Sequence, residues 1–208
     1  IALLRPRLEL AEREVGRRTA VPAMLAGVLA GALMLHGETD QVFEVLADRL
    51  DVIEKLAMPD SILMAYRVLA EVSYRRGEVA RALEYLVALR ELGEVRNLPR
   101  MSLVSLGEQV RIHAIDGRTQ TACELVAQVE ALAPIFESAP YRAMQHLYRR
   151  TLAHARAYTC LAASDLDGAE AFADVLQFDD RGLHVSSLAT ATRLSVHAHQ
   201  LVRMDTPS

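Results

Sequence analysis

The stretch that decides the fold runs from residue 66 to residue 92 and reads YRVLAEVSYRRGEVARALEYLVALREL. It predicts a helix, a tight turn at Gly77 and a second helix. Apolar side chains recur at helical spacing in both halves, at Leu69, Ala70 and Val72 and then at Ala82, Leu83, Leu86 and Leu89. A hairpin this short cannot bury both apolar faces alone, so the sequence predicts copies stacked beside it.

The copies are found by shifting this unit along the chain. Turn glycines fall at positions 37, 77 and 117, two equal intervals of 40 residues. Small or medium apolar residues lie five positions after these glycines (Val42, Ala82, Ala122) and seven positions before them (Ala30, Ala70, Val110). A fourth copy has Ser164 at its turn and Ala169 after it, at an interval of 47. We expect its seven extra residues to lengthen the helix over residues 141–163 by two turns.

The repeat predicts an all-α protein, an αα-hairpin solenoid with a period near 40 residues. We expect one superhelical domain over residues 1–208, composed of a half repeat at 2–16, repeats at 20–56, 60–93, 100–133 and 141–177, and a last helix at 184–203. Ala2 lies one period before Val42, so residues 2–15 match a second helix without its first. We therefore expect a fragment of a longer solenoid.

Composition limits the partners that the chain could bind. Its 23 basic and 27 acidic residues give a net charge of -4, and no basic stripe with interleaved aromatic residues is present. Direct nucleic-acid binding is therefore not expected. Cys123 and Cys160 lie 37 positions apart without a C-x-x-C pattern. They are typical of reduced core cysteines in a cytoplasmic protein.

Residues 20–35 resemble a membrane segment, since they carry no charge and contain Gly27-x-x-x-Gly31. A spanning helix needs about 20 residues, and the GxxxG pattern also packs helices closely. The alternative is a fully buried first helix of a repeat. Gly37 and Val42 place the segment in the repeat register, which favours the buried helix and predicts no membrane partner.

Motifs for catalysis or cofactor binding are absent from the sequence. It has no phosphate-binding glycine loop, no G-x-S-x-G and no H-E-x-x-H. His197 and His199 are two positions apart, and helix geometry points such side chains in opposite directions. His146 and His154 lack a carboxylate at metal-ligand spacing. We expect no catalytic residue, no metal and no cofactor in this fragment, and no enzyme activity.

The remaining candidate surface is a groove lined by the first helices of the hairpins. Side chains at the inward positions before each turn would form a polar and aromatic patch consisting of Arg67, Glu71, Tyr74, Arg111, His154 and Tyr158. This patch would bind a peptide or a small polar ligand. In the other interpretation it is a solvated helix face, on which Arg67, Glu71 and Arg75 form ordinary i,i+4 ion pairs.

Several segments resemble a known family. Asn97-Leu98-Pro99-Arg100, LVSLGEQVRIHAIDGR, ACELVAQVEAL and SSLATATRLSVHAHQLV look like the MalT-like helical repeat region of large ATP-binding LuxR-class transcriptional regulators. These repeats are TPR-like (tetratricopeptide-like). The resemblance implies an N-terminal module that binds ATP and a C-terminal helix-turn-helix domain that binds DNA, neither of them within these residues. The family has no fixed ligand motif, so the resemblance assigns no binding residue.

The resemblance implies a non-catalytic sensor region of a bacterial transcriptional regulator. A small-molecule inducer or a protein partner in the groove would favour one arrangement of the array and so control activation. The two end helices would expose apolar faces, so self-association is a further possibility. DNA would be contacted only through the absent helix-turn-helix domain. The alternative is a stand-alone TPR-type scaffold for protein–protein interaction, and an enzyme is favoured only by the unpartnered histidines.

Overall fold

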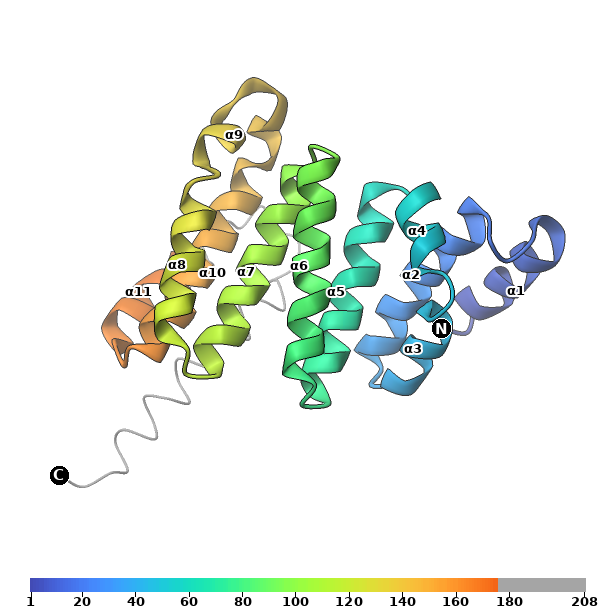
Figure 1. Cartoon of the computed structure of the whole chain (residues 1–208), viewed down its shortest axis with the longest axis horizontal. Coiled ribbons are helices and arrows are strands. Elements are labelled where there is room, and N and C mark those ends of the chain that lie inside the picture. The colour runs from blue at the N-terminus through green and yellow to red at the C-terminus, as the bar shows by residue number, and fades with distance from the viewer. Residues whose placement is uncertain (176–208) are drawn as a thin grey trace. The chain divides into compact units, whose positions relative to one another are not determined.

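The computed structural model describes residues 1–175, and the regular secondary structure of this part is all helix, without a strand (Figure 1). The all-α prediction is therefore confirmed for the described residues. The chain divides into two compact units, Ile1–Leu98 and a second unit that begins at Pro99. The single superhelical domain stays a prediction.

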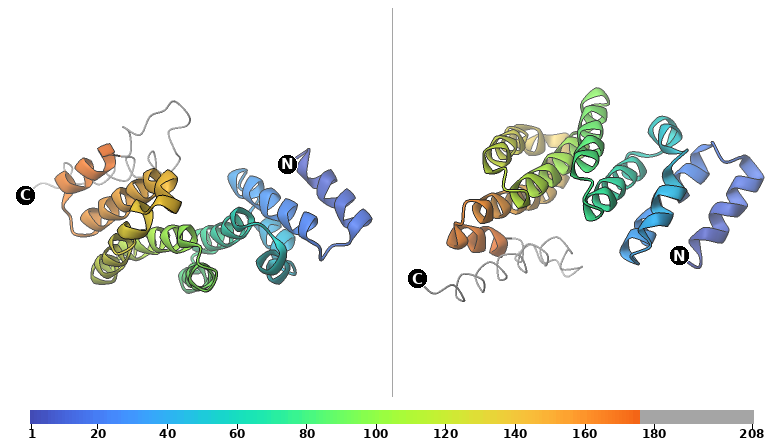
Figure 2. Two further views of the ribbon diagram at one scale, coloured as in Figure 1. Left: turned by 90° about the horizontal axis from the view of Figure 1, so that it is seen from above. Right: turned by 60° about the horizontal axis from the view of Figure 1, so that its bottom comes forward.

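The first unit contains α1 (Leu4–Val15), α2 (Ala20–Leu35), α3 (Thr39–Leu46), α4 (Leu50–Leu56), α5 (Pro59–Arg75) and α6 (Val79–Val95). Helix α2 packs against α1, α3, α4 and α5, and α5 also pairs with α6. The second unit contains α7 (Pro99–Ile115), α8 (Thr119–Glu130), α9 (Ala133–Glu137), the 3₁₀ helix η1 (Ala139–Met144), α10 (Gln145–Ala162) and α11 (Leu166–Val175). Here α10 packs on α7, α8 and α11, and Figure 2 shows α10 and α11 side by side in both views.

The apolar segment at residues 20–35 is helix α2, which is buried along one side but not fully buried as predicted, since Val21, Val28 and Leu35 are 53%, 49% and 81% exposed. A Cβ at Gly27 would lie 3.3 Å from the carbonyl oxygen of Ser61, and a Cβ at Gly31 would lie 3.2 Å from the sulfur of Met64. The two glycines therefore allow α5 to approach closely. No helix in residues 1–175 combines the length and the apolar character that crossing a membrane requires.

The hairpin turns share one hydrogen-bonding pattern. In each turn a residue with positive φ is followed by a backbone N–H that bonds back to a carbonyl in the last turn of the helix, which is the Schellman arrangement. These bonds run from Glu38 to Leu33, Glu78 to Ser73, Arg118 to His113 and Asp165 to Cys160, at 2.9–3.0 Å. The φ angles are 79° at Gly37, 80° at Gly77, 74° at Gly117 and 61° at Ser164. The four turns are thus equivalent in structure.

The small residues predicted at the helix crossings are buried. Those after the turns, Val42, Ala82, Ala122 and Ala169, are all 0% exposed. Those before the turns, Ala30, Ala70 and Val110, are 0%, 3% and 0% exposed. A larger side chain at these positions would push the paired helices apart.

Two predicted helices are wrong in detail. The second helix of the first hairpin, predicted as continuous to residue 56, is interrupted between α3 and α4, where Arg49 is buried. The helix predicted over residues 141–163 has no additional turns, since α10 has 18 residues and α5 has 17. The extra residues form α9 and η1, where Pro134 and Pro140 begin new helical segments.

The structure describes the N-terminal end of the predicted array but not its C-terminal end. The half repeat predicted at residues 2–16 is α1, but Ala2 is exposed and does not make the close contact expected of it. In α1, Leu8 is the buried residue. The last helix, predicted at residues 184–203, lies outside the described residues.

Candidate functional site

The groove residues of the first unit lie on α5. Arg67 is exposed, while Glu71 and Tyr74 are partly buried. Glu71 accepts a hydrogen bond from Nε of Arg75 at 2.7 Å, one helical turn further along. This i,i+4 pair is the one expected for a solvated helix face, so part of the polar character of the predicted patch belongs to α5 itself.

The groove residues of the second unit are more buried than predicted. Arg111 pairs with Glu108 of its own helix at 2.9 Å. His154 and Tyr158 are only 2% and 5% exposed, and their rings meet edge to face at a centroid distance of 4.9 Å. These two residues therefore do not form an open wall.

The burial of His154 and Tyr158 has a direct structural cause. Thr151, His154 and Tyr158 lie at helical spacing on one face of α10. A Cβ at Gly107 of α7 would lie 2.6 Å from a methyl carbon of Thr151. The missing side chain of Gly107 thus lets α7 approach this face of α10, and the face predicted as inward becomes a contact between helices.

The structure adds a polar site that sequence reasoning missed. Arg49 is 4% exposed, although it is charged. It lies 40 residues before Leu89 and 80 before Val129, and both of these are 0% exposed. The repeat register could have identified Arg49, because it places a guanidinium where the other two hairpins have a core aliphatic residue.

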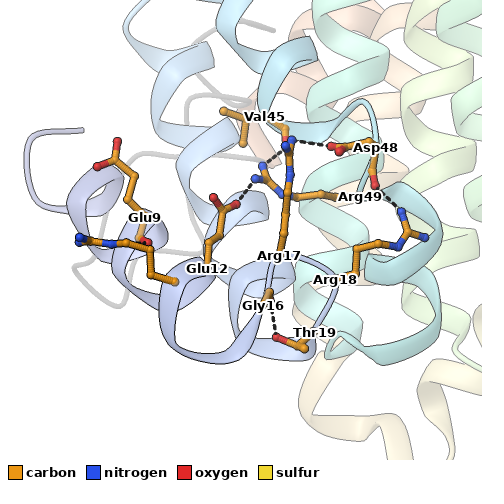
Figure 3. Close-up of polar contacts among 10 residues, drawn as sticks. Glu9, Glu12, Gly16, Arg17, Arg18, Thr19, Val45, Asp48 and Arg49 are labelled. Atoms are coloured by element: carbon orange, nitrogen blue, oxygen red, sulfur yellow. Dashed lines mark hydrogen bonds and ion pairs between the residues drawn. The ribbon is translucent and has the colours of Figure 1, made fainter.

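The guanidinium of Arg49 connects α1 with the interruption between α3 and α4 (Figure 3). Its Nη2 pairs with Oε1 of Glu12, and its Nη1 donates to the backbone carbonyl of Val45 at 2.5 Å. Its buried Nε has no hydrogen-bond partner among the described residues. Burial lowers the pKa of Arg49, while the carboxylate of Glu12 raises it. The ion pair with Glu12 thus compensates a charge that burial disfavours.

Two further arginines extend this arrangement toward solvent. Arg17 pairs with Asp48 at 2.7 Å, and Arg18 donates to the backbone carbonyl of Asp48 at 3.0 Å (Figure 3). Arg18 also pairs with Asp51 at 2.5 Å. All four side chains are about half exposed. We name Glu12, Arg17, Arg18, Asp48, Arg49 and Asp51 the Arg49 cluster.

The Arg49 cluster is a set of ion pairs that connects neighbouring helices and has a structural role. Each of its guanidinium groups faces a carboxylate, so no excess positive charge is directed at a ligand. Among the described residues, no three His, Cys, Asp or Glu side chains are grouped to hold a metal ion. The cluster therefore holds α1 and the loop after it against α3 and α4.

No protein-family model, no curated protein and no solved structure matches the chain.

Proposed function

We propose that the chain is a TPR-like helical-repeat region with a non-catalytic, regulatory binding role. The observation that carries the proposal is the equivalence of four hairpin turns, three of them 40 residues apart, with buried small residues at matching positions around them. Hairpins that repeat in this way bury their apolar faces by stacking, and stacked hairpins offer extended surfaces to partners.

Contacts between neighbouring hairpins support stacking within each unit. In the first unit, α2 and α5 approach through Gly27 and Gly31, and in the second unit, α7 and α10 approach through Gly107. In both cases the first helix of one hairpin packs against the first helix of the next. A solenoid requires this contact, because it leaves the outer faces of the first helices on one side.

A second set of contacts joins the first two hairpins at their turns. Arg76, beside the turn of the second hairpin, pairs with Asp40 and lies 4.5 Å from the ring centre of Phe43. Arg81 lies 5.0 Å from the same ring centre. Cation–π contacts of this kind add roughly 0.5–1 kcal/mol each at exposed sites. They favour one fixed stacking of the two hairpins.

The proposed role is that of a sensor region in a MalT-like, LuxR-class transcriptional regulator of bacteria. A protein partner or a small-molecule inducer would contact the surface of α5 that carries Arg67, Glu71 and Tyr74. ATP and DNA would be bound by neighbouring modules of the full protein. The segments that resemble this family and the absence of a catalytic motif in the sequence support the proposal.

The second candidate is a stand-alone TPR-type scaffold that binds segments of partner proteins. It is favoured by the same repeated turns and differs only in what surrounds the repeats. The reading frame of the gene separates the two candidates. A P-loop before the repeats and a helix-turn-helix after them would support the regulator, and the absence of both would leave the scaffold.

A binding experiment tests the shared part of both candidates. Partners captured from a lysate of the source organism by the wild-type protein are identified by mass spectrometry, and the capture is repeated with Arg67→Ala. Lys55→Ala is the matched control, since Lys55 is a 73% exposed side chain of α4. We expect a partner that Arg67→Ala weakens by at least about tenfold, on the order of 1.4 kcal/mol. Equal capture by all three proteins would remove Arg67 from the proposed binding surface.

A further inference from the structure

One row of residues on α8 contacts α10 at both of its ends. Thr119, Cys123, Val126 and Glu130 are spaced by four, three and four positions, so they share one side of the helix. At one end of the row, Oγ1 of Thr119 donates to the carbonyl of Ala162 at 3.4 Å. At the other end, Glu130 accepts two hydrogen bonds from Arg156, at 2.6 and 3.1 Å. Both contacts reach α10.

The matching row of α10 contains the second cysteine. Arg156 and Cys160 are one helical turn apart on the same side of α10, and Arg156 points to α8. The two end contacts make α8 and α10 antiparallel, and this register brings Cys123 and Cys160 to the same level between them. The charge of Cys123 acts on Cys160, which agrees with this placement. Cys123 is exposed, Cys160 is half-buried, and both are free thiols.

We propose that Cys123 and Cys160 are a redox-sensitive thiol pair that closes to an intramolecular disulfide in exchange with a low-molecular-weight disulfide such as oxidised glutathione. In the first step the thiolate of Cys123 attacks one glutathione sulfur. A mixed disulfide forms on Cys123 and one glutathione thiolate leaves. In the second step the thiolate of Cys160 attacks the sulfur of Cys123 and expels the second glutathione. Two protein thiols are oxidised, one small disulfide is reduced, and their two protons end on two glutathione thiols.

The two cysteines have different roles because their surroundings differ. Cys123 meets the reagent first because it is exposed, and access governs the first attack. Burial raises the pKa of Cys160, and the nearby charge of Asp165 and that of Cys123 raise it further, while Arg156 lowers it. Cys160 is therefore a slow attacker of reagents in solution. It reacts when the mixed disulfide is held opposite it on α8.

Formation of the disulfide would affect the start of α11 through Asp165. The charge of Asp165 raises the pKa of the Cys160 thiol, and Oδ1 of Asp165 accepts the backbone N–H of Gly168 at 2.9 Å, in the first turn of α11. A disulfide removes the titratable thiol whose pKa this carboxylate affects, and the same carboxylate caps α11. Oxidation thus acts directly beside the start of α11.

The experiment treats the folded full chain with oxidised glutathione and follows intact mass and free thiols over time. The variants Cys123→Ser and Cys160→Ser are treated in parallel. For the wild type we expect free thiols to fall from two per chain to none, with a monomer mass lower by two hydrogen atoms and no retained glutathione. Cys160→Ser should retain one glutathione, and Cys123→Ser should remain largely unmodified.

Three results would overturn the proposal. The wild type could keep a stable glutathione on Cys123, which would mean that Cys160 does not reach it. It could form a disulfide-linked dimer instead of an internal bond. Closure could also proceed faster in urea-unfolded protein than in folded protein, which would mean that the fold separates the two thiols.

Discussion

Each unit of the protein contains a hairpin whose second helix is interrupted. A buried ion pair lies at the interruption in the first unit, and a buried aromatic side chain lies at the one in the second unit. In the first unit, the break between α3 and α4 buries Arg49 against Glu12 of α1. In the second unit, α8 ends at Glu130 and α9 follows, burying Phe136 at 0% exposure. The ring of Phe136 stacks on that of Tyr148 at a centroid distance of 5.6 Å. The uninterrupted α6 has only Leu89 at the position of Arg49.

The difference teaches how a repeat tolerates an irregular stretch. A buried apolar side chain such as that of Phe136 only has to fit the available space, and the stabilisation it gives grows with the apolar area removed from water. A buried charged side chain such as that of Arg49 requires a partner of opposite charge, here from another helix. Such an ion pair adds little net stability, but removing one member destabilises the fold strongly because the other charge stays buried. Arg49 therefore makes α1 necessary to the first unit, whereas Phe136 serves the second unit through packing alone.

Phe136→Ala should have the largest effect on stability. Removing a fully buried aromatic side chain leaves a cavity and costs about 3–5 kcal/mol. The free energy of unfolding is measured by urea titration, with Ile135→Ala as the control, since Ile135 is its neighbour and is 38% exposed. Equal losses for the two variants would mean that α9 does not contribute to the core.

Glu12→Ala should be the next in size. It leaves the guanidinium of Arg49 buried without its carboxylate, at a cost of about 2–3 kcal/mol, less than for a fully buried pair because the Glu12 side chain is 24% exposed. Adding Arg49→Leu, which restores the residue type of Leu89, should recover most of this loss. The control is Glu9→Ala on the exposed side of α1. If the double variant is less stable than Glu12→Ala, the ion pair is not what matters at this break.

The sequence predicted the parts of the fold that depend on local rules repeated along the chain. The turns at Gly37, Gly77 and Gly117 were found because few residues other than glycine adopt positive φ. The interruptions were missed, because they depend on partners far away in sequence, such as Glu12 for Arg49. The sequence placed His154 and Tyr158 on a groove wall, and the structure buries both, because helical spacing gives the direction of a side chain and not its neighbour.

Substitutions at the positive-φ residues of two turns should change stability by smaller amounts and in opposite directions. Gly77 has φ 80° and Ser164 has φ 61°, and nothing lies within 4 Å of a Cβ added at Gly77. Gly77→Ala should therefore cost about 1 kcal/mol from backbone strain alone. Ser164→Gly should gain up to about 1 kcal/mol by relieving the same strain. Thermal unfolding measures both, and a change of the same sign in both variants would contradict equivalent turns.

The smallest expected effect is a pH dependence centred on His113 of α7. Burial lowers the pKa of His113 below its ordinary value of 6.5, and the charge of Arg118 lowers it further. The folded state thus binds the proton less well than the unfolded state. The stability that the neutral ring contributes is present above pH 6.5 and is lost as the pH falls through the lower folded pKa. His113→Gln should flatten this slope in urea titrations, and an unchanged slope would assign it to other groups.

The most direct test of the shared hairpin geometry compares Ala122→Leu with Ala127→Leu on α8. Ala122 is 0% exposed at the crossing with α7, while Ala127 is exposed on the same helix. We expect the free energy of unfolding to fall by about 1–3 kcal/mol for Ala122→Leu and to change by less than about 0.5 kcal/mol for Ala127→Leu. Equal values for the two variants would contradict a close helix crossing at this position of the repeat.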